Sequence, residues 1–286
     1  MVCWLVDELL SERAYETGFP SIADVAKELG HQVYKTKYIP FSKVPDWRIA
    51  SEFPQGSCVV THGTIQFCKQ VEKHFGRMWT PGMYFNQNVK HFSRYAVHIG
   101  EDLLNYDFSI LPYGVIVEKM KLEEYSEPVF IKPEYGLKEF VGQFINGPED
   151  LDILSPQVPI DPYILCVVAE PQHIKAEFRY VICEKEVIAG SEYRWDNILD
   201  VRRDTHPVCD KLAEQIAKAE WQADTVYVCD IALIVEDHIR GGDLCLDEVA
   251  KVIELNAFSS SGLYACDTYK IVEAVSKAAE REHGGN

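Results

Sequence analysis

The apolar run Val226–Val235 contains one charged residue, Asp230. A run of this length, made of Val, Tyr, Ile, Ala and Leu, is typical of a buried strand. A carboxylate inside such a strand is costly to desolvate unless it is paired with a cationic side chain or bound to a metal ion. Any fold of this chain must therefore bring one of two partners to Asp230, either a structural salt bridge or a cation such as Mg²⁺.

A second polar pair lies near the C-terminus, in the segment Val252–Phe258. Glu254 and Asn256 occupy positions i and i+2, so on a strand they project from the same face. A carboxylate beside a carboxamide offers the hard oxygen donors that Mg²⁺ prefers. Two interpretations are open for this pair: a magnesium site, or an edge strand with two exposed polar residues.

The first hundred residues alternate between strand and helix patterns. The predicted elements are strands at 2–6, 32–39 and 58–62 and helices at 21–29 and 66–75. Ser21 is the expected N-cap of the first of these helices. This β-α-β order predicts a parallel sheet with helical crossovers.

The second half reads as antiparallel strands interspersed with helices. The predicted strands are 164–169, 177–183, 186–193, 226–235 and 252–258, and the predicted helices are 205–221 and 267–281. The residues Asp237–Asp247 are expected to loop out between the last two strands. The fold class is therefore α+β with an α/β N-terminal part.

Composition restricts the classes of partner and the compartment. The net charge of −17 argues against general binding to nucleic acid or to an anionic membrane. No apolar run is long enough to span a bilayer, and the N-terminus lacks the basic region of a secretory signal. The nine cysteines are scattered without a Cys-x-x-Cys pair, which favours buried thiols in a reducing cytoplasm.

Basic side chains lie where they could contact phosphate groups. Lys132 ends an apolar strand, and the following segment contains Gly136 and Lys138. The two ammonium groups could bind phosphates as compact cations, and Gly136 would permit close approach of the backbone. Arg179 and Arg194 lie on two strands of a hairpin, where guanidinium groups could hold a γ-phosphate or an acyl-phosphate. The alternatives are solvated lysines and arginines in ordinary ion pairs.

The order of these features resembles the ATP-grasp superfamily of carboxylate–amine ligases. The matching phrases are Ile131-Lys132-Pro, the segment with Gly136 and Lys138, the Glu170/Glu177 pair, Glu177-Phe-Arg179, Asp230 and Glu254-Leu-Asn256. The phrases Phe130–Gly142, Ser191–Arg194 and Phe258–Tyr264 are similar to one branch found in bacteria and phages. The resemblance covers about residues 100–275, and the preceding residues match as the α/β domain that such ligases carry.

The resemblance implies an ATP-grasp fold, in which a nucleotide is held between two α+β subdomains behind an N-terminal α/β domain. The expected boundaries are 1–100 for the N-terminal domain, 101–163 for the central subdomain and 164–286 for the C-terminal subdomain. ATP and Mg²⁺ are the implied cofactors.

The resemblance also implies roles for individual residues. Nucleotide binding falls to Lys132, Gly136, Lys138, Glu170, Glu177 and Asp230, metal binding to Asp230, Glu254 and Asn256, and catalysis to Lys138, Arg179 and Arg194. The backbone around Glu170–His173 would read the adenine edge, and Glu177 would accept the ribose hydroxyls. A further basic residue is expected earlier in the chain, with Arg77, Arg94 and Lys119 as alternatives.

The implied activity is an ADP-forming, ATP-dependent ligase of the cytoplasm. It would activate a small-molecule or peptide carboxylate as an acyl-phosphate for attack by an amine or a similar nucleophile. A nucleotide-binding regulator and a small-molecule phosphotransferase are the alternatives that use the same pocket. A homodimer is a possible assembly, with no membrane or general nucleic-acid partner.

Overall fold

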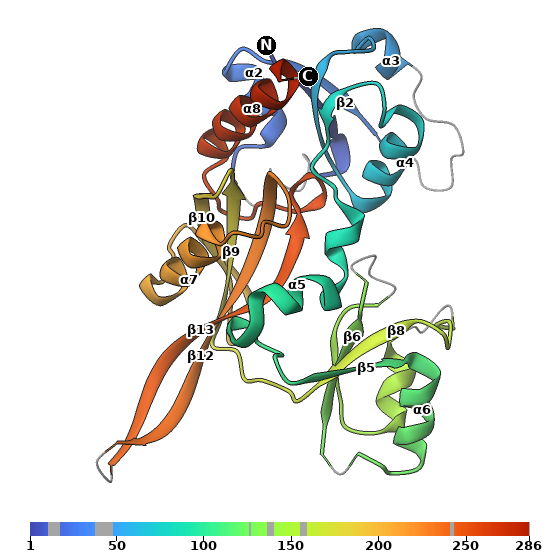
Figure 1. The fold of residues 1–286 in the computed structure, drawn as a ribbon, viewed down its shortest axis with the longest axis vertical. Coiled ribbons are helices and arrows are strands. Elements are labelled where there is room, and N and C mark those ends of the chain that lie inside the picture. Colours follow the sequence, from blue (N-terminus) through green and yellow to red (C-terminus); the bar gives the residue numbers. More distant parts are fainter. Residues whose placement is uncertain are drawn as a thin grey trace.

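The computed structural model describes residues 1–10, 18–37, 48–125, 127–135, 140–154, 159–240 and 243–285. Gly136 and Lys138, both predicted to bind phosphate, lie outside these residues. The described chain forms three sheets, which Figure 1 shows with α8 beside the first, the second at the lower right, and the third between them. None of its helices is long and apolar enough to cross a membrane.

The N-terminal sheet is parallel, as its β-α-β pattern predicts. Its strands are β1 (Cys3–Asp7), β2 (Gln32–Thr36), β3 (Cys58–His62) and β4 (Thr80–Gly82), in the order β2-β1-β3-β4. The helices of this part are α2 (Ile22–Glu28), α3 (Arg48–Glu52) and α4 (Ile65–Phe75). The Ser21 side chain accepts a hydrogen bond from the Asp24 N–H and so caps α2.

The middle sheet is antiparallel. Its strands are β5 (Phe108–Pro112), β6 (Val129–Pro133), β7 (Gln143–Ile145) and β8 (Leu165–Ala169), in the order β5-β8-β6-β7, accompanied by α6 (Tyr113–Lys121) and η3 (Pro148–Ile153). β8 pairs with both β5 and β6. The boundary predicted between residues 163 and 164 falls immediately before this strand, and the three-part division stays a prediction.

The C-terminal sheet has five strands. They are β9 (Ala176–Cys183), β10 (Glu186–Trp195), β11 (Ile198–Arg202), β12 (Val226–Arg240) and β13 (Asp243–Ala257), in the order β11-β10-β9-β12-β13. The helical elements are α5 (Phe92–Ile99), α7 (Pro207–Lys218) and α8 (Thr268–Gly284), with the short turns η1 (Gln87–Lys90), η2 (Gly100–Asp102) and η4 (Phe258–Ser260). Every described pairing in this sheet is antiparallel.

The expected excursion at Asp237–Asp247 is wrong. β12 and β13 stay paired from Tyr227 opposite Ala257 to Arg240 opposite Asp243, and the resulting ribbon projects from the sheet at the lower left of Figure 1. The acidic residues of this stretch suggested a loop. Backbone pairing between two neighbouring strands overrides such weak preferences, and two glycines separate the strands in sequence, a composition typical of a two-residue hairpin turn.

Alternation along β9 gives the C-terminal sheet two different faces. Phe178, Tyr180 and Ile182 point into a core with α5 and α7. Val181 and Cys183 point the other way, into a core that also contains α8 and the N-terminal sheet. Because side chains alternate along a strand, Arg179 and Glu177 continue the second face beyond the edge of that core.

The N-terminal and C-terminal sheets share one core. Trp4 of β1, Val228 of β12 and Ile271 of α8 belong to the same cluster of buried side chains. The Trp4 indole N–H also donates to the Ser276 hydroxyl of α8 over 3.1 Å. The first hundred residues and the last hundred are therefore held together by apolar burial and form one cooperative unit.

Replacing Ile271 by Ala tests this shared core. The side chain is fully buried, so the change should lower the free energy of unfolding by about 2–5 kcal/mol. Urea unfolding should remain a single transition with an earlier midpoint, because both sheets lose the same packing. Lys277→Ala, which removes an exposed ion pair with Glu273, is the control and should cost less than about 1 kcal/mol. Two transitions, of which one moves, would contradict a shared core.

Candidate active site

Polar residues gather on one face of the C-terminal sheet. Arg179 of β9 lies opposite Asp230 of β12, and Asp230 lies opposite Glu254 of β13. Glu177 and Asn256 follow at a spacing of two on their own strands, which places them on the same face. The sheet therefore brings together five of the residues that the sequence predicted for nucleotide, metal and phosphate contacts.

Arg179 and Asp230 form a bidentate ion pair. Arg179 Nε donates to Asp230 Oδ1 over 2.8 Å, and Nη2 donates to Oδ2 over 2.7 Å. Only 10% of the Arg179 side chain and 2% of the Asp230 side chain are exposed. Burial by itself would lower the pKa of the guanidinium, but Asp230 outweighs it and raises that pKa above its ordinary value. A salt bridge is thus one partner of the carboxylate in the apolar strand.

Asn256 connects this ion pair to Glu254. Its Nδ2 group donates to Asp230 Oδ2 over 3.0 Å and to Glu254 Oε1 over 2.8 Å. The two carboxylates occupy directly opposed positions on neighbouring strands, where like charges repel. The amide and the guanidinium keep them together.

The same residues fit a Mg²⁺ ion by their chemistry. Asp230, Glu254 and Asn256 carry hard oxygen donors at one place, and a divalent cation would relieve the repulsion between the opposed carboxylates. The described residues contain no cluster of three His, Cys, Asp or Glu side chains placed to hold a metal. A metal bound here would therefore take two carboxylates and the carboxamide oxygen from the protein and its other ligands from elsewhere.

Lys132 reaches this face from the middle sheet. It lies near the end of β6, and its Nζ atom donates to the Ile253 carbonyl of β13 over 3.4 Å. The ammonium lies 4.5 Å from the centre of the Phe92 ring of α5, a cation–π contact. Burial lowers the pKa of Lys132, while Glu254 and Asp230 act in the opposite direction. The ammonium of one sheet and the carboxylates of the other thus share one electrostatic environment.

A cavity lies where these two sheets meet. Its lining includes Phe92, Tyr95, Lys132, Glu134, Glu254 and Asn256. The Arg179–Asp230 pair adjoins this lining through Asn256. The cavity therefore has a cationic wall from the middle sheet and an anionic wall from the C-terminal sheet.

A family model described as an ATP-grasp domain, the second family of one clade of that superfamily, matches residues 115–274, more than half of the chain. The chain belongs to this ATP-grasp family. The match spans both walls of the cavity. A search of the curated proteins finds no match.

Solved structures share this ATP-grasp fold at low identity. D-cycloserine synthetase DcsG has a TM-score of 0.60 at 10% identity, over 98% of this chain and 100% of that one. D-alanine–D-alanine ligase from Bacillus anthracis, complexed with ATP, has a TM-score of 0.56 at 12% identity, over 100% and 99%. The ATP-grasp ligase PsnB, complexed with a minimal precursor, has a TM-score of 0.54 at 13% identity, over 97% and 98%. The predicted superfamily and fold class are confirmed.

Glu177 and Arg194 form a second polar group beside the ATP-grasp cavity. Arg194 Nη1 donates to Glu177 Oε1 over 3.0 Å, and the Tyr193 hydroxyl donates to Oε2 over 2.5 Å. Both oxygens of Glu177 thus have protein donors. Glu170 lies apart from them, exposed directly after β8, where its carbonyl accepts from the Asn105 side chain over 3.4 Å. The ribose and adenine roles of Glu177 and Glu170 remain predictions.

Sequence reasoning missed the role of Glu134, which follows Lys132 by two residues. The Ser93 hydroxyl and backbone N–H donate to Glu134 Oε1, over 2.5 and 3.2 Å, and His91 Nδ1 lies 2.7 Å from Oε2. Burial alone would raise the pKa of Glu134, but these hydrogen bonds hold it below its ordinary value. The carboxylate therefore caps α5 from a different part of the chain. A local pattern could not reveal this cap, because 41 residues separate Ser93 from Glu134.

Removing this cap should destabilise the protein. Glu134→Ala leaves buried donors of α5 without their charged acceptor, so the free energy of unfolding should fall by about 2–3 kcal/mol. Ser21→Ala removes the neutral cap of α2 and should cost about 1 kcal/mol. Urea unfolding of the two variants makes the comparison. An equal or smaller loss for Glu134→Ala would show that its carboxylate does not hold α5.

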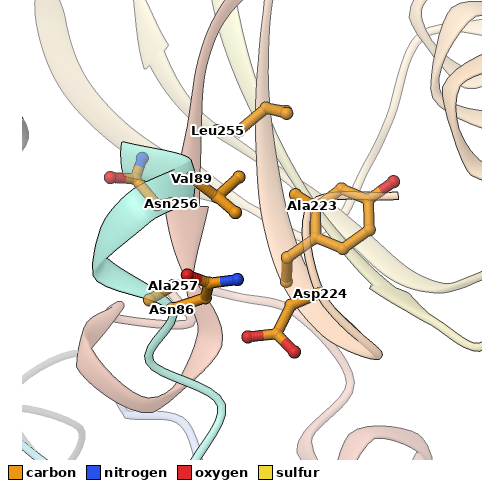
Figure 2. A pocket seen from close by; sticks show the side chains of 8 residues that line it. Asn86, Val89, Ala223, Asp224, Leu255, Asn256 and Ala257 are labelled. Carbon is orange, nitrogen blue, oxygen red and sulfur yellow. The ribbon is translucent and has the colours of Figure 1, made fainter. Parts of the chain in front are cut away.

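A small second cavity lies on the other side of η1. Figure 2 shows the Asn86 amide and the Asp224 carboxylate facing each other there, while the Asn256 side chain points away. Asp224 accepts a hydrogen bond from the Thr225 N–H over 2.8 Å, and burial raises its pKa to about 6. Asp224 is thus separate from the carboxylates of the ATP-grasp cavity.

His62 ends β3 at the border with the C-terminal sheet. Its ring is buried, and its Nε2 atom lies 3.0 Å from the Ser261 carbonyl. Burial lowers the pKa of His62 from 6.5 to about 4, although the Ser261 carbonyl and Asp7 act in the opposite direction. The folded protein therefore holds this imidazole neutral at pH values where the unfolded chain would protonate it.

This shift predicts a loss of stability in mild acid. Between pH 6.5 and about 4 the unfolded chain binds the extra proton and the folded chain does not. Stability should therefore fall as the pH decreases through this window, by about 3 kcal/mol in total. Urea midpoints at pH 7 and 4.5 should differ more for the natural protein than for His62→Gln, whose side chain does not titrate. Equal pH dependence in the two proteins would contradict a buried neutral His62.

Proposed function

We propose that this ATP-grasp protein is a magnesium-dependent, ADP-forming ligase that uses ATP to activate a carboxylate for attack by an amine. One observation carries the proposal. Lys132 of the middle sheet reaches into a cavity whose opposite wall holds Glu254 and Asn256, beside the Arg179–Asp230 pair. A polyphosphate with a divalent cation has the charge pattern that these two walls complement.

The structures that share the fold support the same class of activity. One is a D-alanine–D-alanine ligase solved with ATP, one a D-cycloserine synthetase, and one an ATP-grasp ligase bound to a precursor. The proposed substrates of this chain are accordingly small-molecule or peptide carboxylates and amines.

Each described residue of the site has a proposed task. Lys132 binds phosphate oxygens as a compact cation. Arg179 has five N–H donors, of which Asp230 and the Gly262 carbonyl take three, so two remain for an oxygen of the transferring phosphoryl group. Arg194 and Glu177 stand next to it, and Glu170 follows at the adenosine end. Gly136 and Lys138, outside the described residues, would close over the phosphates.

Asp230, Glu254 and Asn256 are the residues that would hold Mg²⁺. When bound, Mg²⁺ would neutralise charge on the phosphate oxygens and help to orient them. Asn256 would then turn its carboxamide oxygen, in place of its Nδ2 group, toward the carboxylates' side of the cavity.

The chemistry needs little from protein nucleophiles. An oxygen of the substrate carboxylate attacks the γ-phosphorus, the bond to the bridging oxygen breaks, and ADP leaves. The amine then attacks the acyl carbon of the acyl-phosphate, loses a proton and expels inorganic phosphate, which leaves an amide. Holding the two substrates in line supplies most of the rate.

Glu254→Gln tests the site. The change keeps the shape of the side chain but removes a charge from the proposed metal set, so Mg-dependent ATP turnover should fall by about two orders of magnitude or more. Glu248→Gln makes the same substitution on the same strand, where Glu248 instead pairs with Lys175 and His206, and should keep full turnover. Unchanged turnover in Glu254→Gln would end the assignment.

Product analysis separates the ligase from the two alternatives. ADP and phosphate should appear only when an acid and an amine are both present in a panel of amino and carboxylic acids. A stable phosphorylated product would identify a phosphotransferase. ATP binding without turnover across the panel would identify a nucleotide-binding regulator.

A further inference from the structure

The segment between β13 and α8 is bonded to the N-terminal sheet. Within this segment, Phe258–Tyr264, the Ser259 N–H donates to the Tyr84 carbonyl over 3.1 Å and its hydroxyl accepts from the Tyr84 N–H over 2.9 Å. The Ser259 carbonyl accepts from the Gly63 N–H over 2.8 Å. Three hydrogen bonds of one serine thus attach the segment to the residues after β3 and β4.

His62 adds a fourth, buried contact to the same segment. A carbonyl oxygen can only accept, so the Nε2 atom that lies 3.0 Å from the Ser261 carbonyl must carry the proton of the neutral ring. The centre of the ring lies 5.3 Å from that of Phe258. The imidazole therefore holds Ser261 by one hydrogen bond and by packing against Phe258.

The next residue of the segment holds Arg179. The Gly262 carbonyl accepts from Arg179 Nη1 over 2.6 Å. The guanidinium carbon lies 4.7 Å from the centre of the Tyr264 ring, and that ring stacks on Tyr193 at 4.5 Å. Tyr264 has a φ of 49°, a left-handed conformation that a non-glycine residue adopts at a cost. The segment thus fixes one edge and one face of the guanidinium, while Asp230 fixes the other edge.

We propose that His62 is a positioning residue for Arg179. It acts through the Ser261 and Gly262 peptide, so the N-terminal sheet sets the direction in which the two remaining guanidinium N–H donors point. The proposal rests on the proposed function, in which these donors stabilise the transferring phosphoryl group. It assigns a task to the Phe258–Tyr264 phrase and to the N-terminal domain, neither of which the nucleotide and metal contacts require.

His62→Leu removes the donor and keeps an apolar side chain of similar size. We expect kcat to fall about tenfold with the KM for ATP almost unchanged, because the lost interaction orients a group that acts in the transition state. His62→Gln, whose terminal amide can donate to the Ser261 carbonyl, should recover most of the rate. Thr61→Val is the matched control, since Thr61 is the preceding buried residue of β3 and its hydroxyl has no hydrogen-bond partner in the described chain. It should keep the natural kcat.

Measurements other than turnover complete the test. The melting temperature and the affinity for ATP of His62→Leu show whether the variant is folded and binds nucleotide. The ¹⁵N-resolved Nε–H signal of Arg179, assigned with Arg179→Lys, should shift in His62→Leu and keep its position in His62→Gln. A folded His62→Leu protein with natural kcat and an unmoved Arg179 signal overturns the proposal. Equal losses of kcat in the Leu and Gln variants also overturn it, since packing alone would then explain both.

The two levels of inference fail in different ways. If the natural protein shows no ATP turnover with any acid and amine, the proposed function fails. If the natural protein turns over ATP and Glu254→Gln does not, the ligase assignment stands and the His62 variants decide the positioning role alone.

Discussion

The ion pair between Arg179 and Asp230 is the interaction on which the rest of the site depends. Both side chains are almost completely buried, on central strands of the C-terminal sheet. Breaking such a pair leaves an uncompensated charge in an apolar interior, which costs far more than the pair contributes to stability when intact. The neighbouring groups are therefore arranged around it: Asn256 completes the hydrogen bonds of the carboxylate, and Gly262 those of the guanidinium.

Three sheets converge on this pair from different directions. The C-terminal sheet supplies the carboxylates, the middle sheet supplies Lys132, and the N-terminal sheet holds the segment that contacts Arg179. Glu134 joins the middle sheet to α5, and α5 packs in the core of the C-terminal sheet. The cavity is thus a junction, and its geometry depends on contacts among parts of the chain that are far apart in sequence.

Much of the fold followed from local patterns. Ser21 caps α2, and the β-α-β order of the first hundred residues forms a parallel sheet. The patterns were less reliable where neighbouring strands decide the outcome. The ribbon of β12 and β13 continues through Asp237–Asp247 because each strand pairs with the other, although acidic residues there have low strand propensity. β8 pairs with β5 and β6, a long-range choice that no local pattern contains.

The sequence by itself determined that Asp230 needs a partner and that Glu254 and Asn256 share a face, because burial cost and strand alternation are local properties. The order of motifs was also sufficient to identify the ATP-grasp superfamily. Only the tertiary structure decided that Arg179 is the residue paired with Asp230, that Glu134 caps α5, and that His62 bonds to Ser261. These contacts join residues 41 to 199 positions apart. Strand register and the packing of the three sheets select them, and neither is present in any short segment of the chain.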